Sequence, residues 1–182
     1  MQQPATDGET GPDTERFRLR SFVELLIAHD QVEIHDDPVP LTTLARHLDG
    51  NEKAVLFRKA GPEQVEIVGN ILGNRARIGY AFDLPREQVP EEINRRLRNP
   101  QPVVEISSAD APVHEVILTG DDADLTKLPV HLQHAMDGGP YISASVDYAC
   151  DPETGHRNAG IRRMMLRGPK EAGVDLTAPS DL

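Results

Sequence analysis

The stretch from Pro140 to Arg167 constrains the fold of this chain more than any other, because two strand patterns and a turn follow one another within it. From Tyr141 to Tyr148 polar and apolar side chains alternate, with the period of two that a half-buried strand needs. Residues 151–155, Asp-Pro-Glu-Thr-Gly, supply a proline with a fixed φ and a glycine that tolerates positive φ. The pattern therefore predicts a β-hairpin.

The second limb of this hairpin, residues 157–166, has an unusual composition for a paired strand. It ends in apolar residues, and before them come Asn158, Gly160, Arg162 and Arg163. Two adjacent arginines and a glycine are rare among the core residues of a strand unless an anionic group lies close to the backbone. This limb is the main candidate for a binding site.

Three blocks of the sequence resemble one known family. They are residues 56–82, residues 124–142 and the hairpin itself, in the order in which the UbiD-like, prenylated-flavin-dependent decarboxylases carry them. In that family a DGG-x-Y-[IL] strand leads through a turn into an Asn-x-Gly/Ser-x-x-Arg strand. The matching positions are Asp137, Gly138, Gly139, Tyr141, Ile142, Asn158, Gly160 and Arg163.

The resemblance implies an α/β N-terminal domain followed by the first part of a mostly β split-barrel flavin-binding domain. It implies reversible, non-oxidative decarboxylation of an aromatic or α,β-unsaturated carboxylic acid with prenylated FMN. Arg163 matches the catalytic arginine that faces the substrate carboxylate, which a guanidinium binds in bidentate fashion. The positions implied to contact the cofactor are Asn158, Gly160, Ile161, Arg162 and Arg163.

The resemblance also implies a metal ion, Mn²⁺ or Mg²⁺, between the cofactor phosphate and protein oxygens, with K⁺ as a further candidate cation. Asn158 matches the family's metal-ligating asparagine, and an amide oxygen suits a hard cation. Asp181 takes the place of the family's histidine ligand, once one inserted residue is allowed. The family's glutamate ligand and its proton-donating glutamate have no counterpart before Leu182.

Two features of the motif complicate the assignment of the family's residue roles to this sequence. Arg162 stands where many family members carry tyrosine, and Met165 where they often carry glutamine, so the substrate stays open. Asn158 and Arg163 are five residues apart, and an ideal strand would point them to opposite faces. We expect a bulge near Gly160, or a strand that begins only after Asn158, to bring them together.

The rest of the chain divides into three parts. Residues 1–15 are polar and acidic and predict a disordered tail. Residues 16–120 alternate between helical and strand patterns and predict an α/β domain, and residues 121–182 predict an incomplete β domain. The expected helices and strands are helices near 16–29, 41–48, 75–80 and 90–97, and strands near 31–35, 54–58, 64–68, 103–106 and 113–118.

The composition narrows the classes of partner. A net charge of −11 argues against nucleic acid or an anionic membrane, since phosphate binding needs a basic surface. No apolar run is long enough to span a bilayer, and the single cysteine, Cys150, fits a reducing cytoplasm. We expect a cytoplasmic protein that binds a small aromatic or unsaturated acid, receives its cofactor from a flavin prenyltransferase, and forms a homo-oligomer or pairs with a missing downstream half.

Several alternatives stay open. The glycines of residues 69–74 favour a tight turn before a helix over a phosphate loop, because no Lys-Ser/Thr follows them. His131 and His134 have a spacing that metal ligands use, but they are more simply loop histidines. The whole chain is either the N-terminal part of an enzyme, as one piece of a longer protein or as a separate polypeptide, or a non-catalytic assembly subunit or truncated product that binds no flavin.

Overall fold

The computed structural model describes residues 15–101, 105–134 and 136–175. The predicted tail and Asp181 lie outside the described residues, apart from Glu15. The chain divides into two compact units. The first unit comprises Met1–Ile34, Gly50–Leu56 and Val68–Asp110, and the second comprises His35–Asp49, Phe57–Ile67 and Ala111–Leu182.

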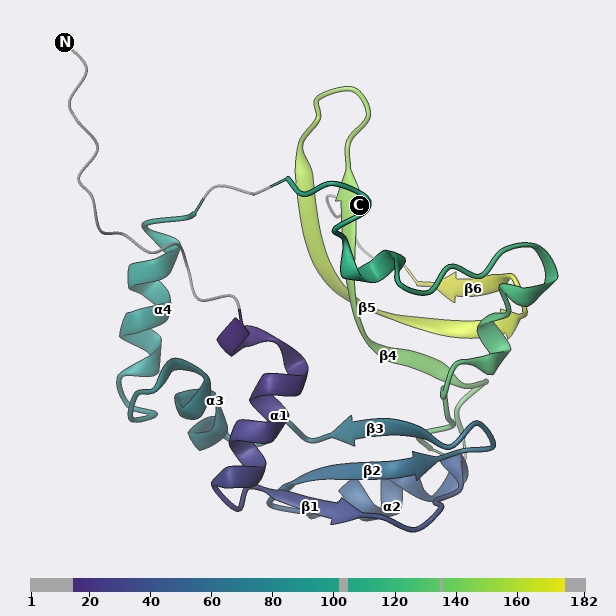
Figure 1. The fold of residues 1–182 in the computed structure, drawn as a ribbon, viewed down its shortest axis with the longest axis horizontal. Coiled ribbons are helices and arrows are strands. Elements are labelled where there is room, and N and C mark those ends of the chain that lie inside the picture. Colours follow the sequence, from purple (N-terminus) through teal and green to yellow (C-terminus); the bar gives the residue numbers. More distant parts are fainter. Residues whose placement is uncertain (1–14, 102–104, 135, 176–182) are drawn as a thin grey trace. The chain divides into compact units, whose positions relative to one another are not determined.

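Helices and strands alternate in the first part of the chain, and a long β-hairpin dominates the second (Figure 1). One three-stranded sheet has the order β1-β2-β3 and the other the order β4-β5-β6. This confirms the expected fold class. The helices are α1 (Leu19–Ala28), α2 (Leu44–Leu48), α3 (Arg75–Phe82) and α4 (Val89–Leu97), and the strands are β1 (Val32–His35), β2 (Ala54–Ala60), β3 (Val65–Gly69), β4 (Tyr141–Cys150), β5 (Arg157–Gly168) and β6 (Glu171–Val174).

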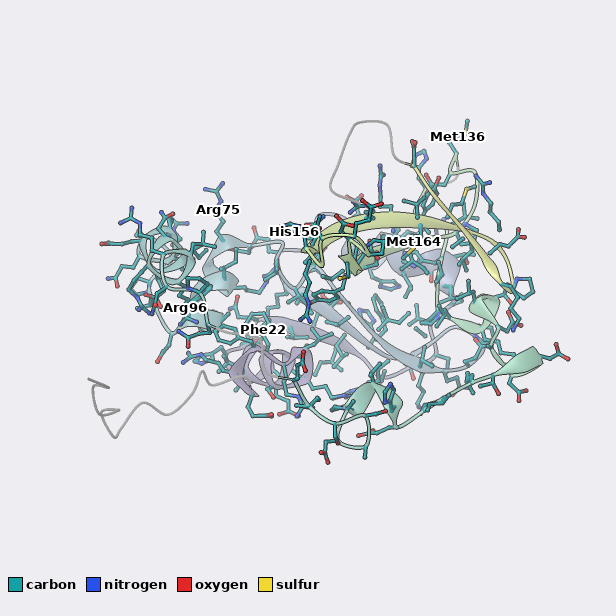
Figure 2. The ribbon with its side chains drawn as sticks, turned by 90° about the horizontal axis from the view of Figure 1, so that it is seen from above. Phe22, Arg75, Arg96, Met136, His156 and Met164 are labelled. Atoms are coloured by element: carbon teal, nitrogen blue, oxygen red, sulfur yellow. The ribbon has the colours of Figure 1, made fainter. Side chains whose placement is uncertain are left out.

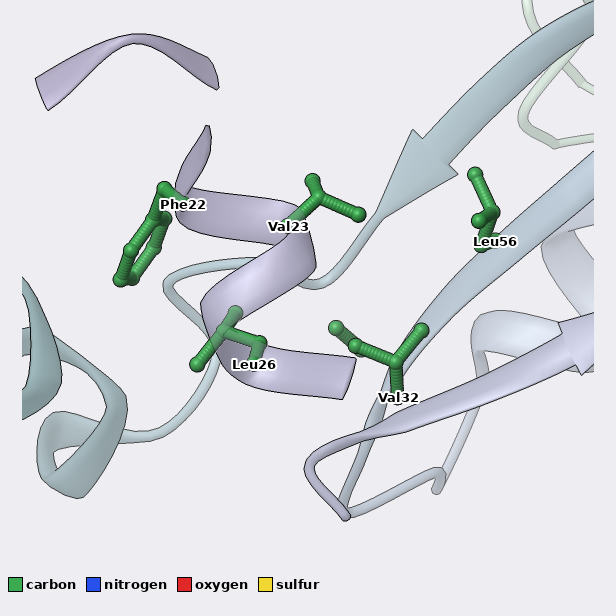
Figure 3. Close-up of a cluster of buried hydrophobic side chains, with 6 residues drawn as sticks. Phe22, Val23, Leu26, Val32 and Leu56 are labelled. Carbon is green, nitrogen blue, oxygen red and sulfur yellow. The ribbon is translucent and has the colours of Figure 1, made fainter. Parts of the chain in front are cut away.

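The core of the first unit forms on the inner face of α1. Phe22, Val23 and Leu26 lie within about one helical turn of one another and form one cluster of buried side chains with Val32 and Leu56 (Figure 3). Leu26 is fully buried. Burial of such a side chain contributes about 1.5–3 kcal/mol, so this cluster holds α1 on its sheet.

A single arginine organises the turn that precedes α3. Arg77 is 1% exposed, and its guanidinium donates to the carbonyl oxygens of Ile71 at 3.0 Å, Glu52 at 2.6 Å and Asn70 at 2.7 Å. Asn74 caps the helix by accepting from the backbone N–H of Ala76 at 2.8 Å. The glycine-rich segment is therefore a tight turn before a helix, as expected.

Charge placement on α4 complements the helix macrodipole, with acidic residues in the first turn and arginines in the last. Glu92 in the first turn accepts from Arg95 and from Arg96, each at 2.7 Å, and these bonds lower the pKa of Glu92 to about 2. The guanidinium of Arg96 also lies 5.4 Å from the ring centroid of Phe17 and 5.0 Å from that of Phe82. Cation–π contacts of this kind stabilise the attachment of α4.

Two strands were predicted between the last helix and the hairpin, near residues 103–106 and 113–118. The second prediction is wrong, and the first is only partly tested. Residues 113–118 form no strand. A 3₁₀ turn covers Pro112–His114, and Val116 and Ile117 are largely exposed. Of the other predicted strand, residues 103 and 104 lie outside the described residues, and 105 and 106 carry no strand.

Candidate functional site

The candidate site lies on the antiparallel hairpin of β4 and β5 in the second unit. Pairing is regular from Cys150 opposite Arg157 to Ser145 opposite Arg162, and the register then shifts before Ile142 opposite Met164. The bulge therefore lies in β4, where two residues stand opposite Arg163. The expectation of a bulge near Gly160, or of a strand that begins after Asn158, is wrong.

Because β5 itself stays regular from Arg157 to Met165, its side chains alternate there between two faces. The first, which we call the Asn158 face, holds Asn158, Gly160 and Arg162, all partly buried. The second, the Arg163 face, holds Arg163 and Ile161, which is 80% exposed. The structure thus brings three of the five predicted cofactor residues together and sets the other two on the opposite face.

Because Gly160 has no side chain, it leaves space on the Asn158 face for a neighbouring group. A Cβ placed on Gly160 would lie 3.3 Å from Cζ of Arg162 and closer still to its Nη1. The guanidinium of Arg162 therefore folds back over the glycine. A larger residue at position 160 would displace it, so the glycine provides the space that the guanidinium occupies.

Two residues of β4 complete this face. Ser145, opposite Arg162, donates from Oγ to the carbonyl oxygen of Arg162 at 2.8 Å and lies 3.4 Å from Oδ2 of Asp147. Asp147 is directly opposite Gly160. Sequence reasoning missed both residues, although their alternation with Val146 was visible, because only the register shows which β5 residues they face.

The hairpin turn is held by Asp151. Its carboxylate accepts from the backbone N–H of Glu153 at 2.8 Å and from Oγ1 of Thr154 at 2.5 Å, and the bond from Thr154 is the main cause of its lowered pKa. Gly155 has a φ of +72°, a conformation that favours glycine. The predicted turn is confirmed.

The glycines before β4 have a packing role. A Cβ on Gly139 would lie 3.3 Å from Cγ of Met165, so the glycine leaves room for this side chain. The backbone N–H of Leu166 donates to the carbonyl oxygen of Pro140 at 2.9 Å. In Figure 2, His156 lies at the turn end of the hairpin and Met164 within β5, while Met136 projects from the preceding loop and is largely exposed.

The alternative ligands from the sequence do not gather into a metal site in the described part of the chain. No group of three or more His, Cys, Asp or Glu side chains converges there. His131 bridges to Tyr141, and burial lowers the pKa of its imidazole. Cys150 is exposed and forms no disulfide.

A hollow in the first unit contains none of the predicted site residues. It has a volume of about 760 Å³ and lies along α4. Its lining mixes carboxylates and guanidiniums, of which Glu92 and Arg95 form an ion pair with each other. The hairpin therefore remains the candidate site. The lining residues are Leu84, Gln88, Glu91, Glu92, Asn94, Arg95 and Arg98.

Two family models match the chain. The 3-octaprenyl-4-hydroxybenzoate carboxy-lyase N-terminal domain matches residues 23–97, and the Rift-related domain of the same carboxy-lyase matches residues 104–181. Together the two matches span most of the sequence. The chain belongs to the UbiD family.

Relatives of this UbiD-family chain include proteins of named activity. A protein of the cooM 5′ region of Rhodospirillum rubrum is 32% identical over 88% of the chain and 34% of its own length. Anhydromevalonate phosphate decarboxylase of Methanothermobacter thermautotrophicus is 29% identical over 86% of the chain and 36% of its own length. The chain thus spans about a third of the length of the curated relatives it matches.

The structure resembles UbiD-class enzymes as well. An evolved dimeric form of HmfF from Pelotomaculum thermopropionicum, solved in complex with prFMN, aligns with a TM-score of 0.78 and 30% identity. The alignment covers 87% of the present chain and 38% of that chain. Within the described part of the UbiD-family chain, no helix has the length and apolar character needed to cross a membrane.

The donor set of the Asn158 face fits part of a metal-tethered phosphate. An asparagine oxygen can ligate a hard cation, and a guanidinium over a glycine can meet a phosphate. The guanidinium of Arg162 occupies the space above Gly160, and Asn158 lies on the same face of β5. Asn158 is the residue that could hold a metal, and Arg162 the one that could hold a phosphate.

Proposed function

We propose that this chain supplies the N-terminal part of a UbiD-class carboxy-lyase that decarboxylates an aromatic or α,β-unsaturated acid, reversibly and without oxidation. The observation that carries the proposal is the Asn-x-Gly-x-x-Arg limb, which lies on β5 with Asn158 partly buried and Arg163 exposed. The proposed domains are residues 16–120 and 121–182, with the boundary near the start of the β region.

In this proposal prenylated FMN supplies the electron sink that decarboxylation requires. Asn158 donates an amide oxygen to Mn²⁺ or Mg²⁺, and Asp181 stays a predicted second ligand, as K⁺ stays a predicted further cation. Gly160 and Arg162 border the cofactor phosphate on the Asn158 face, and Ile161 and Arg163 border the cofactor from the Arg163 face. The remaining protein groups, among them the carboxylates that the family motif requires, come from polypeptide beyond the matched third.

Arg163 is the proposed catalytic residue. Its exposed guanidinium can bind the substrate carboxylate with two parallel hydrogen bonds and keeps its charge while CO₂ leaves. The opposite placement of Asn158 and Arg163 supports a division of labour, with cofactor phosphate and metal on one face of β5 and the substrate carboxylate on the other.

The test uses the assembled protein, by which we mean this chain joined to, or co-expressed with, the remaining two thirds of a family polypeptide. It is produced together with a flavin prenyltransferase and purified. Bound flavin is measured by absorbance, metal content by elemental analysis, and activity by CO₂ release from a panel of aromatic and unsaturated acids. Oligomeric state is measured by light scattering.

Three variants separate the proposed roles. Arg163→Met is expected to lower activity about 100-fold or more, in line with the loss of one charge-stabilising group, while bound flavin is retained. Asn158→Ala is expected to lose metal and flavin together. Arg157→Met, on the same face of the same strand as Arg163, is the matched control and should keep both. An assembled wild type that never carries flavin would instead support the non-catalytic assembly subunit.

A further inference from the structure

One carboxylate on the Asn158 face has no assigned role. Asp147 is partly buried and stands directly opposite Gly160. Gly160 has no side chain, and the guanidinium of Arg162 fills the space above it. Asp147 on β4 and the guanidinium of Arg162 on β5 therefore both lie next to the space above Gly160.

The spacing of an antiparallel pair places these groups within reach of each other. Cβ positions directly opposite one another lie about 4.5–5.5 Å apart, and Cζ of Arg162 lies 3.3 Å from the Cβ position of Gly160. A charged hydrogen bond between the two side chains requires rotation about the side-chain bonds of Asp147 or Arg162. Arg162 is otherwise a long side chain with much rotamer entropy to lose when it binds an anion.

Ser145 connects the two residues. Its hydroxyl lies 2.8 Å from the carbonyl oxygen of Arg162 and 3.4 Å from Oδ2 of Asp147. The shorter contact fixes the serine against β5. The carboxylate of Asp147 lies on the same face as the guanidinium because Asp147 pairs with Gly160.

We propose that Asp147 is a positioning residue that holds the guanidinium of Arg162 over Gly160, ready to bind the phosphate of a flavin mononucleotide. The inference rests on the proposed function, since it needs flavin to bind on this face. A guanidinium has five N–H donors, so it can donate to Asp147 and to a phosphate at once. Asp147 reduces the side-chain freedom that phosphate binding would otherwise have to remove.

The experiment compares FMN with riboflavin, which has the same ring system and no phosphate. Dissociation constants are measured by flavin fluorescence at fixed salt for the assembled protein and its variants. Wild type is expected to prefer FMN. Asp147→Asn should reduce that preference about tenfold, the equivalent of one charge-assisted hydrogen bond, and Asp147→Glu should largely restore it. In an Arg162→Met background, Asp147→Asn should have no further effect.

Two results would overturn the positioning role. Equal weakening of FMN and riboflavin binding by Asp147→Asn would mean that Asp147 only supports the fold. An unchanged or increased preference for FMN would mean that it does not position Arg162. Binding of neither flavin to the assembled wild type would count against the proposed function itself.

A second measurement is independent of flavin. The side-chain Nε–H signal of Arg162 is followed by NMR in the 182-residue chain. Asp147→Asn should shift this signal and speed its exchange with water, Asp147→Glu should preserve it, and Arg157 serves as the internal reference. If the chemical shift and exchange rate of the Arg162 Nε–H signal did not change in Asp147→Asn, the proposal would be overturned whatever the flavin data show.

Discussion

The turn before α3 and the β4–β5 hairpin both combine glycine with arginine, yet they use the arginine differently. In the turn, all the hydrogen bonds of the buried Arg77 go to backbone carbonyls of its own unit. On the hairpin, and within the described part of the chain, the exposed guanidinium of Arg163 has no hydrogen-bond partner. An arginine whose donors are used by the backbone is part of the fold, whereas one whose donors face open surface is available to a ligand.

The largest expected difference between the two regions concerns apolar truncation. Leu26→Ala in the first unit should lower the free energy of unfolding by about 2–5 kcal/mol, because a fully buried leucine leaves a cavity. Ile161→Ala on the hairpin should change it by less than about 0.5 kcal/mol, because the side chain is 80% exposed. Urea denaturation of both variants makes the comparison, and equal losses would show that Ile161 is buried in solution.

Removal of the buried guanidinium of Arg77 is expected to have the next largest effect on stability. Arg77→Met keeps much of the length of the side chain but leaves three backbone carbonyls without their donor. Each buried unsatisfied group costs about 1–3 kcal/mol, so with some rescue by water we expect a loss of about 3 kcal/mol. Denaturation measures it, and Arg75→Met, an exposed arginine on the same helix (Figure 2), is the control that should have little effect.

The second unit contains an exposed counterpart of Arg77. The ammonium of Lys170, in the turn before β6, donates to the carbonyl oxygens of Gly120 and Ala123. Because this lysine is exposed, water can replace it, and Lys170→Met should cost only about 1 kcal/mol. Hydrogen exchange at Leu125, whose N–H donates to Pro169, should quicken. A loss as large as that of Arg77→Met would remove the contrast between the two regions.

The sequence predicted well those elements whose signals are local. The hairpin turn is set by Pro152 and Gly155, and α1 by its apolar face, so both were predictable. The features that depend on a partner distant in the sequence could not be predicted from local patterns. The bulge opposite Arg163 depends on how β4 and β5 are aligned, and the burial of Arg77 depends on carbonyls of the segment before β2 and of the turn before α3.

Residues 113–118 also show that a local sequence pattern does not reveal whether a distant partner is present. Their alternating pattern predicts a strand, but a strand also needs a neighbour to receive its hydrogen bonds. In the described part of the chain none pairs with it, and Val113 is 78% exposed. The short strand β6 was missed for the converse reason, since Glu171–Val174 has little strand pattern and pairs because Gly168 and its neighbours turn the chain back.

The smallest expected effect is a pH dependence at the base of the hairpin. Burial lowers the pKa of His131 below its ordinary value of 6.5, so the folded chain favours the neutral imidazole more than the unfolded chain does. The stability that this contributes is complete above the unfolded pKa of 6.5 and is lost as the pH falls through the lower folded pKa.

We therefore expect the bridge from His131 to Tyr141 to loosen in mild acid before the first unit responds. An NMR titration of the imidazole gives the folded pKa, and hydrogen exchange at Tyr141 reports the opening between about pH 5 and about pH 7, the range in which histidine titrates. In His131→Gln the exchange should lose this pH dependence, after correction for the intrinsic rate. A folded pKa at or above 6.5 would contradict the prediction, because burial favours the neutral imidazole and no carboxylate of the described residues pairs with it.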